Sequence, residues 1–147
     1  MHYMKNRIEC ATRKDYQQFA EVHKRFVYLS SSELRETIMD EETFNEYADM
    51  GRIFVAFDGD VMVGYAVVTA YEDGKCHINE IFVLPEYQHK GYGKQIVDKI
   101  IVEAKESGLN KLLVFSLLIE TDAFWMRRCF FFESKEEDEA GYLIRKI

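Results

Sequence analysis

Residues 77–118 predict a strand, a loop, a helix and a second strand, in that order. His77–Leu84 has the composition of a strand, and Gly91–Ser107 carries apolar residues at helical spacing before Gly108, a natural stop. Lys111–Leu118 is almost wholly apolar, as expected of a strand covered on both faces. Such a βαβ unit places its first loop at the carboxyl end of a strand, where α/β sheets tend to bind ligands.

That loop holds the chain's only proline, Pro85, and two of its eight glycines, Gly91 and Gly93. Glycines at the start of a helix let backbone N–H groups approach a ligand, and the helix N-terminus adds a partial positive charge that suits phosphate. The polar side chains beside them are those of His89, Lys90 and Lys94. An ordinary glycine-eased turn explains the G-x-G pattern equally well. A Walker phosphate loop is excluded, because no G-x-x-x-x-G-K-[ST] occurs.

The elements before this unit begin with a strand at Arg7–Ala11. Thr12 and Asp15 predict a capping box, and residues 16–27 continue with helical periodicity. Ser30–Ser32 is expected to cap a second helical stretch of uncertain bounds, or two short helices, carrying Leu34, Ile38, Phe44 and Tyr47.

The remaining segments read as strands and one short helix. Ile53–Phe57 and Val61–Tyr71 predict a hairpin through Asp58-Gly59-Asp60, which His77–Leu84 extends to an antiparallel meander. After residue 118 we expect a short helix, Thr121–Arg128, and two strands, Phe130–Ser134 and Gly141–Lys146, separated by an acidic turn.

Composition bounds the class of protein. With 147 residues, 48% of them hydrophobic, the chain is expected to form a single domain over residues 1–147. A net charge of −7 argues against general binding to nucleic acid. We expect no membrane segment, because the longest apolar stretch is far shorter than the roughly 20 residues that a bilayer requires. We expect no signal peptide, because the first ten residues lack an apolar run. Cys10, Cys76 and Cys129 show no CxxC spacing, so we expect reduced thiols in a cytoplasmic protein and no metal site.

The sequence Gln88-His89-Lys90-Gly91-Tyr92-Gly93 matches the Q/R-x-x-G-x-G/A signature of the GCN5-related N-acetyltransferases, the GNAT superfamily. Phe124–Phe130 resembles that family's later F-Y-x-x-x-G-F segment, and the order of elements is similar over roughly residues 7–147. The resemblance implies an α/β (α+β) fold with the order β-α-α-β-β-β-α-β-α-β-β. In that fold, about four helices flank a central mixed, mostly antiparallel sheet of six to seven strands.

The resemblance also implies acetyl-CoA as co-substrate, attacked directly by an amine within a ternary complex. The backbone of Ile81, Phe82 and Val83 would pair with the pantetheine arm, and an N–H of this strand end would polarise the thioester carbonyl. The N–H groups of the signature would hold the pyrophosphate. The residues whose N–H groups would hold the pyrophosphate are Gln88, His89, Lys90, Gly91, Tyr92, Gly93 and Lys94.

Candidate bases for deprotonating the amine lie on the strand before the loop. His77 stands where histone-type members carry a glutamate, and Asn79 where polyamine-type members carry one, although an asparagine cannot act as a base. Glu80 is a carboxylate on the same strand, but strand alternation sends it to the other face. Structural roles for His77 and Glu80, or a water relay from a more distant carboxylate, remain alternatives.

The general acid is the main departure from the family pattern, because Trp125 fills its usual tyrosine position. An indole N–H does not give up a proton near neutral pH. Either the thiolate leaves unassisted, or another tyrosine such as Tyr142 or Tyr65 protonates it. Cys129 stands in place of the family's glycine, which favours a packing role over a reactive one.

Acidic residues concentrate in two segments. Residues 33–50 contain seven acids against Arg35, and residues 133–139 contain five against Lys135. The first segment borders the acceptor site in this family, so the acids either attract a cationic acceptor, such as a polyamine, an aminoglycoside-like amine or a lysine side chain, or form solvated helix faces.

Two classes of function follow. The first is an acetyl-CoA-dependent N-acetyltransferase acting on a primary amine of a small molecule or a protein. The second is a non-catalytic acyl-CoA-binding module with a regulatory or partner-binding role, which Trp125 and Asn79 favour modestly. Homodimers are common in the family, so the resemblance also allows one here.

Overall fold

The computed structural model describes residues 6–29, 38–115 and 124–147, whose strands form a seven-stranded sheet of order β1-β2-β3-β4-β5-β7-β6. The strands are β1 (Asn6–Cys10), β2 (Ile53–Asp58), β3 (Val61–Ala70), β4 (Lys75–Val83), β5 (Lys111–Phe115), β6 (Phe132–Glu133) and β7 (Tyr142–Lys146). The helices are α1 (Tyr16–Leu29), α2 (Glu41–Asp49), α3 (Tyr92–Glu106) and a π-helical turn, Phe124–Arg128. The β4–β5 pair is parallel and the pairs β1–β2, β2–β3, β5–β7 and β6–β7 are antiparallel, which confirms the predicted mixed sheet.

The chain divides into two compact units, and the border runs within β3, β4 and α3. The first unit comprises Met1–Val67 and Ile81–Ile96, and the second comprises Val68–Glu80 and Val97–Ile147. No helix in the described part of the chain is long and apolar enough to cross a bilayer.

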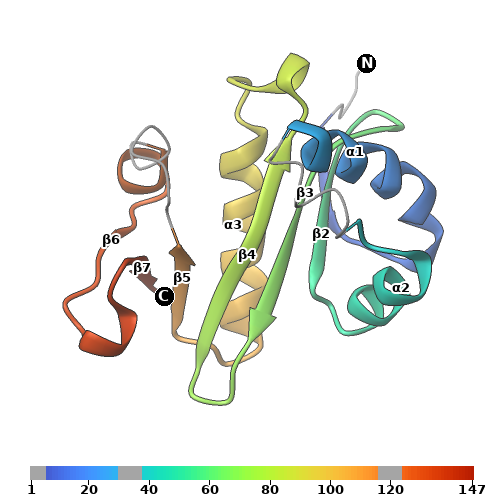
Figure 1. The fold of residues 1–147 in the computed structure, drawn as a ribbon. Helices are drawn as coiled ribbons and strands as arrows, with labels where there is room; N and C mark the ends of the chain where they lie inside the picture. The colour runs from blue at the N-terminus through green and yellow to red at the C-terminus, as the bar shows by residue number, and fades with distance from the viewer. Residues whose placement is uncertain (1–5, 30–37, 116–123) are drawn as a thin grey trace. The chain divides into compact units, whose positions relative to one another are not determined.

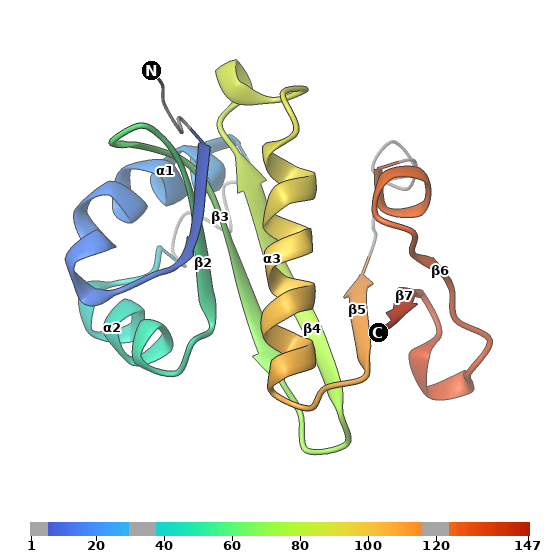
Figure 2. The same ribbon diagram turned by 180° about the vertical axis from the view of Figure 1, so that it is seen from behind.

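In the first unit, α1 and α2 lie beside β2 in both views (Figures 1 and 2). Phe19 of α1 packs its ring 4.7 Å from that of Phe44 on α2 and 4.9 Å from that of Tyr65 on β3, measured between centroids. These three side chains are fully buried. β2 is buried on both of its faces from Ile53 to Phe57, which explains its continuous apolar sequence. The apolar stripes of both helices therefore close one aromatic-rich core.

Local signals set the helix starts. The Thr12 N–H donates to the Asp15 carboxylate at 2.9 Å, which confirms the predicted capping box just before α1. The Asp40 carboxylate accepts the Thr43 N–H at 2.8 Å and so begins α2 at Glu41. Ile38, expected within the second helical stretch, therefore precedes α2. The expected cap Ser30–Ser32 and Leu34 lie outside the described residues.

The second unit is built around β5. Lys111–Phe115 pairs with the first half of β4 on one side and with β7 on the other, which confirms the βαβ crossover. The expected continuation of this strand to Leu118, and the start of the expected helix at Thr121, lie outside the described residues. The strand expected at Phe130–Ser134 is wrong in its bounds, since β6 comprises only Phe132–Glu133. Phe130 has a left-handed φ of 60°, and an extended strand cannot pass through that conformation.

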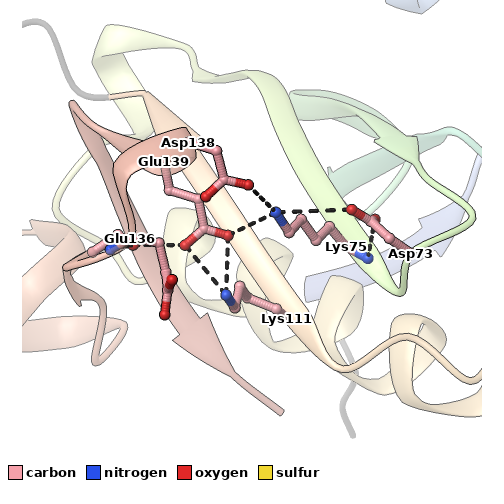
Figure 3. A network of polar contacts seen from close by, with 7 residues as sticks. Asp73, Lys75, Lys111, Glu136, Asp138 and Glu139 are labelled. Carbon is pink, nitrogen blue, oxygen red and sulfur yellow. Dashed lines mark hydrogen bonds and ion pairs between the residues drawn. The ribbon is translucent and has the colours of Figure 1, made fainter.

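A polar network holds the acidic turn before β7 to β4 and β5 (Figure 3). Glu139, only 1% exposed, accepts from Lys111 at 3.0 Å and from the Ser134 hydroxyl at 2.6 Å, and Lys75 lies 3.0 Å away. The Ser134 hydrogen bond and the two ammonium groups lower the pKa of Glu139 to about 2. Asp138 adds a longer contact to Lys75, at 3.4 Å. Part of the acidic segment therefore has a structural role.

Candidate functional site

The loop between β4 and α3 has a backbone that few residue types adopt. After a 3₁₀ turn at Pro85–Tyr87, His89 has a φ of 64° and Gly91 a φ of 93°, both in the left-handed region. The Gln95 N–H donates to the Gly91 carbonyl at 3.1 Å and closes the first turn of α3. The first N–H groups of an α-helix have no carbonyl partner inside the helix, which makes this end of α3 suitable for an anion.

Two side chains of the loop hold its backbone, the exposed one of Gln88 and the buried one of Tyr92. The Gln88 amide donates to the Val83 carbonyl at 2.9 Å, which ties the loop to the end of β4. The Tyr92 hydroxyl donates to Asn6 of β1 at 2.9 Å, and Tyr92 is buried. Burial, together with nearby Asp58, raises the pKa of Tyr92 and keeps the phenol neutral. The side chains of Gln88 and Tyr92 thus hold the loop, and the Gln88 N–H already donates to the Pro85 carbonyl at 3.3 Å.

The charge around the loop favours an anion. Glu86 is held by Arg25 through two hydrogen bonds of 2.7 and 2.9 Å, and this contact lowers the pKa of Glu86. The Lys90 ammonium lies 5.4 Å from the centroid of the Tyr87 ring. His89 and Lys90 are exposed and Lys94 is half-buried. Since Arg25 neutralises Glu86, the positive charge of the two lysines is not cancelled by that carboxylate.

The end of β4 is held close to β3 by a glycine that sequence reasoning missed. A Cβ on Gly64 would lie 2.8 Å from the Phe82 carbonyl oxygen and 3.3 Å from the Val83 Cα. The Leu84 N–H donates to the Val63 carbonyl at 2.8 Å in the same region. A glycine inside an otherwise apolar strand is the sequence signal that could have revealed this close approach. Ile81, Phe82 and Val83 are all half-buried here.

The predicted bases, His77 and Glu80, lie on the part of β4 that belongs to the second unit. The Asn79 amide nitrogen lies 3.1 Å from His77 Nδ1, and the Thr69 hydroxyl donates to the Asn79 amide oxygen at 2.7 Å. Burial lowers the pKa of His77, so its ring is neutral at physiological pH. Glu80 is half-buried and, by strand alternation, belongs to the other face of β4.

Comparison with known proteins shows the family of the chain. The sequence profile of the acetyltransferase (GNAT) family matches residues 6–138. The chain belongs to the GNAT acetyltransferase family. A search of curated proteins gave no significant match.

Many solved structures share the fold. PaiA N-acetyltransferase from Thermoplasma acidophilum, in complex with coenzyme A, is 17% identical, with a TM-score of 0.79 over 98% of this chain and 100% of that chain. A GNAT-family acetyltransferase from Streptococcus pneumoniae is 15% identical, with a TM-score of 0.79 over 97% and 99%. YncA from Salmonella typhimurium, with its cofactor acetyl-CoA, is 13% identical, with a TM-score of 0.76 over 97% and 94%. At these identities the likeness shows the GNAT fold alone.

In the usual GNAT tyrosine position, Trp125 is a core residue. It is 4% exposed, and its ring packs edge-on against Phe124 and Phe131, with centroids 5.0 and 5.2 Å away. Cys129 is also buried, and its carbonyl accepts from Arg145 at 2.9 Å. Burial raises the pKa of the Cys76 thiol to about 11, which disfavours a reactive thiolate.

Tyr65 and Tyr142, the two tyrosines that could replace Trp125 as general acid, differ in their exposure to solvent. Tyr65 has no exposed surface, and its hydroxyl oxygen lies 2.8 Å from Nδ1 of buried His23. Tyr142 on β7 is half-buried, with its ring centroid 5.4 Å from that of His77.

In residues 6–29, 38–115 and 124–147, no group of three or more His, Cys, Asp or Glu side chains could hold a metal ion.

The predicted residues fall into two sets. Ile81–Val83 and Gln88–Lys94 lie together in the first unit, around the carboxyl end of β4 and the start of α3. His77, Glu80 and Trp125 belong to the second unit. Besides Gly64, sequence reasoning missed Thr69, because a threonine in a strand carries no signal of its hydrogen-bond partner.

Proposed function

We propose that this protein is an acetyl-CoA-dependent N-acetyltransferase that transfers an acetyl group to a primary amine by direct attack in a ternary complex. The observation that carries the proposal is the loop with left-handed backbone angles at His89 and Gly91. This loop directly precedes the N-terminus of α3, an end of a helix that suits an anion. Membership of the GNAT family supports the same chemistry.

The loop residues fit the diphosphate of coenzyme A. The backbone N–H groups of His89–Lys94 would hold the pyrophosphate, since Gly91 brings no Cβ to the approach and Lys90 adds a cation. The Gln88 N–H, also expected there, instead donates to the Pro85 carbonyl. The backbone of Ile81–Val83 would pair with the pantetheine arm, and an N–H at this strand end would polarise the thioester carbonyl. When bound, acetyl-CoA supplies the activated acetyl group.

Proton removal from the acceptor falls to His77 or Glu80. An alkyl amine has a pKa near 10.4, so it is mostly protonated at neutral pH and must lose a proton before it attacks. The lowered pKa of His77 keeps the imidazole neutral, which is the form that can accept a proton. Glu80 is the second candidate, on the other face of the strand.

Protonation of the leaving thiolate is better assigned to Tyr142 than to Tyr65. Tyr65 has no exposed surface and is bound to His23, whereas Tyr142 is half-buried next to His77. Trp125 in the usual tyrosine position has no acidic proton to offer near neutral pH. A protein without a working acid would release the thiolate unassisted and more slowly.

The acceptor is a primary amine of a small molecule or a protein. Two acids in the segment around α2 have structural partners. Asp40 caps the helix, and its hydrogen bonds to Thr43 lower its pKa. Asp49 pairs with Arg13, and this contact lowers the pKa of Asp49. Glu41, Glu42 and Glu46 are exposed and carry the charge that would attract a cation.

Release of free coenzyme A thiol from acetyl-CoA, measured with a panel of amines, tests this function. We expect amine-dependent release by the wild-type protein and at least a tenfold loss of kcat in either His77→Gln or Glu80→Gln, according to which residue is the base. Binding of coenzyme A without thiol release for any amine would instead support the non-catalytic module. Failure to bind coenzyme A would refute both functions.

A further inference from the structure

Three polar side chains form a chain of hydrogen bonds on one face of β3 and β4 in the second unit. The Thr69 hydroxyl donates to the Asn79 amide oxygen at 2.7 Å. This bond turns the amide nitrogen of Asn79 toward His77 Nδ1, at 3.1 Å. Strand alternation explains why His77 and Asn79, two residues apart, share a face.

We propose that Asn79, held by Thr69, is a positioning residue that determines which ring nitrogen of His77 carries the proton. The effect of this tautomer on catalysis rests on the proposed function. The tautomer of His77 itself can be measured without any catalytic activity. Neither Asn79 nor Thr69 needs to touch a substrate for this role.

The donor and acceptor roles follow from the chemistry of the three groups. An amide nitrogen can only donate, so His77 Nδ1 must accept and the neutral ring carries its proton on Nε2. A hydroxyl both donates and accepts. If the Asn79 amide turned end for end, its nitrogen would donate to Thr69 and its oxygen would accept from a protonated Nδ1. The lone pair would then lie on Nε2.

This choice matters for removing a proton from an amine. With the amide as the structure has it, the lone pair of His77 is engaged by Asn79 and Nε2 is a donor. A base needs its lone pair free, which requires the reversed amide. The substrate's proton would then move to Nε2, giving an imidazolium with both nitrogens protonated. The orientation of the Asn79 amide would therefore switch His77 between donor and base.

The described neighbours of His77 include an aromatic ring, an apolar side chain and a lysine that is itself ion-paired. The ring of Tyr142 on β7 contacts it edge-on, and Leu113 of β5 is its register partner. Lys75, two residues earlier on β4, is ion-paired with Glu139 at 3.0 Å. Burial disfavours the charged imidazolium, which leaves the neutral tautomers to be decided by hydrogen bonds.

Nitrogen NMR of the full-length ¹⁵N-labelled protein tests the assignment, with His77→Gln identifying the His77 signals. We expect the Nε2–H tautomer in the wild type. In Asn79→Asp, a carboxylate can only accept, so the tautomer should invert to Nδ1–H. Thr69→Val should reduce the excess of Nε2–H, and Thr69→Ser should restore it. A wild-type ring protonated on Nδ1, or a tautomer unchanged in Asn79→Asp, would overturn the proposal.

The pH profile of kcat/KM provides a readout that a merely structural role would not move. A carboxylate beside His77 should raise its pKa by about one unit or more, so the acid limb of Asn79→Asp should shift upward by that amount. An inverted tautomer with an unmoved acid limb would uphold the role of Asn79 and exclude His77 as the base. Absence of turnover in the wild type would refute the proposed function, while the NMR result would still decide the proposal.

Discussion

His89 and Gly91 adopt left-handed backbone angles within three residues of each other, just before α3. For glycine this conformation costs little, whereas a residue with a Cβ pays of order 1–3 kcal/mol in strain. Gly91 could be anticipated from its place in a G-x-G pattern. His89 could not, because histidine, although enriched among left-handed residues, adopts other backbone angles in most positions. The strained histidine is thus a property of the folded loop.

Gly91→Ala should weaken coenzyme A binding at least tenfold, because a Cβ at a φ of 93° strains the loop whose N–H groups would hold the pyrophosphate. Isothermal titration calorimetry measures the dissociation constant. Gly51→Ala is a matched control, since Gly51 has a φ of 71°, has open space around a Cβ and lies in a turn remote in sequence from this loop. Equal losses of affinity in both variants would contradict the role of the loop. The double variant Gly91→Val, Gly93→Val should abolish binding.

Gly64→Ala should lower both the melting temperature and the affinity for coenzyme A, because its Cβ would press on the Phe82 carbonyl at 2.8 Å and move the end of β4. Ala66→Gly serves as the control. It weakens the same buried strand without pushing on β4, so it should lower the melting temperature alone. An unchanged affinity in Gly64→Ala would show that the position of Phe82 and Val83 does not matter for binding.

At the scale of elements, the acidic turn Glu137–Glu139 combines exposed carboxylates with one buried carboxylate that forms ion pairs. Glu137 and Asp138 are exposed, whereas Glu139 is buried among Ser134, Lys75 and Lys111. The sequence predicts an acidic turn between two strands but does not distinguish these carboxylates. Lys75 and Lys111 are brought together by the parallel register of β4 and β5, a pairing between residues far apart in the chain.

Glu139→Gln should reduce the free energy of unfolding at pH 7 by about 3 kcal/mol, the size expected when one partner of a buried ion pair is removed. Urea denaturation measures this difference, and Glu137→Gln, on the exposed side of the same turn, should change it by less than about 0.5 kcal/mol. Similar small effects in both variants would show that the buried network does not stabilise the turn.

The same network sets a dependence of stability on pH. The folded pKa of Glu139 is lowered from 4.5 to about 2, so the folded state binds fewer protons than the unfolded state between these values. Its contribution is fully present above pH 4.5 and is lost as the pH falls toward 2. The stability difference between wild type and Glu139→Gln should therefore narrow over this range. A difference that stays constant would contradict the lowered pKa.

At the scale of the whole molecule, the net charge of −7 is distributed unevenly. The acids of residues 33–50 and 133–139 outnumber the bases there, while the remaining chain is mildly basic and includes the lysines beside α3. Asp40, Asp49 and Glu139 have structural partners, so only part of the acidity can act on a distant ligand.

If the exposed acids of α2 attract the acceptor, kcat/KM for a polyamine should fall as salt rises from about 50 to 500 mM, because screening weakens steering of a cation. A neutral amino acid should show little change. The triple variant Glu41→Gln, Glu42→Gln, Glu46→Gln should lose the salt dependence, while Glu21→Gln with Glu106→Gln, two exposed acids outside that segment, should keep it. Equal rates with polyamines and neutral amino acids would exclude steering.

The sequence alone determined the features that depend on local rules. The order of strands and helices follows from hydrophobic periodicity, the start of α1 from its capping box, and the loop before α3 from glycines whose conformational freedom is intrinsic. The GNAT signature lies in that same short segment. Each of these involves residues close together in the chain, so their types are sufficient to predict them.

The tertiary structure decided the features that depend on residues distant in sequence. Strand pairing places Gly64 against Phe82, buries Glu139 between two lysines and turns the Asn79 amide toward His77. Packing buries Tyr65 and Trp125 and leaves Tyr142 half-exposed. A residue's type states which hydrogen bonds and charges it can offer, but its partners and its exposure to water are set only when the sheet is assembled.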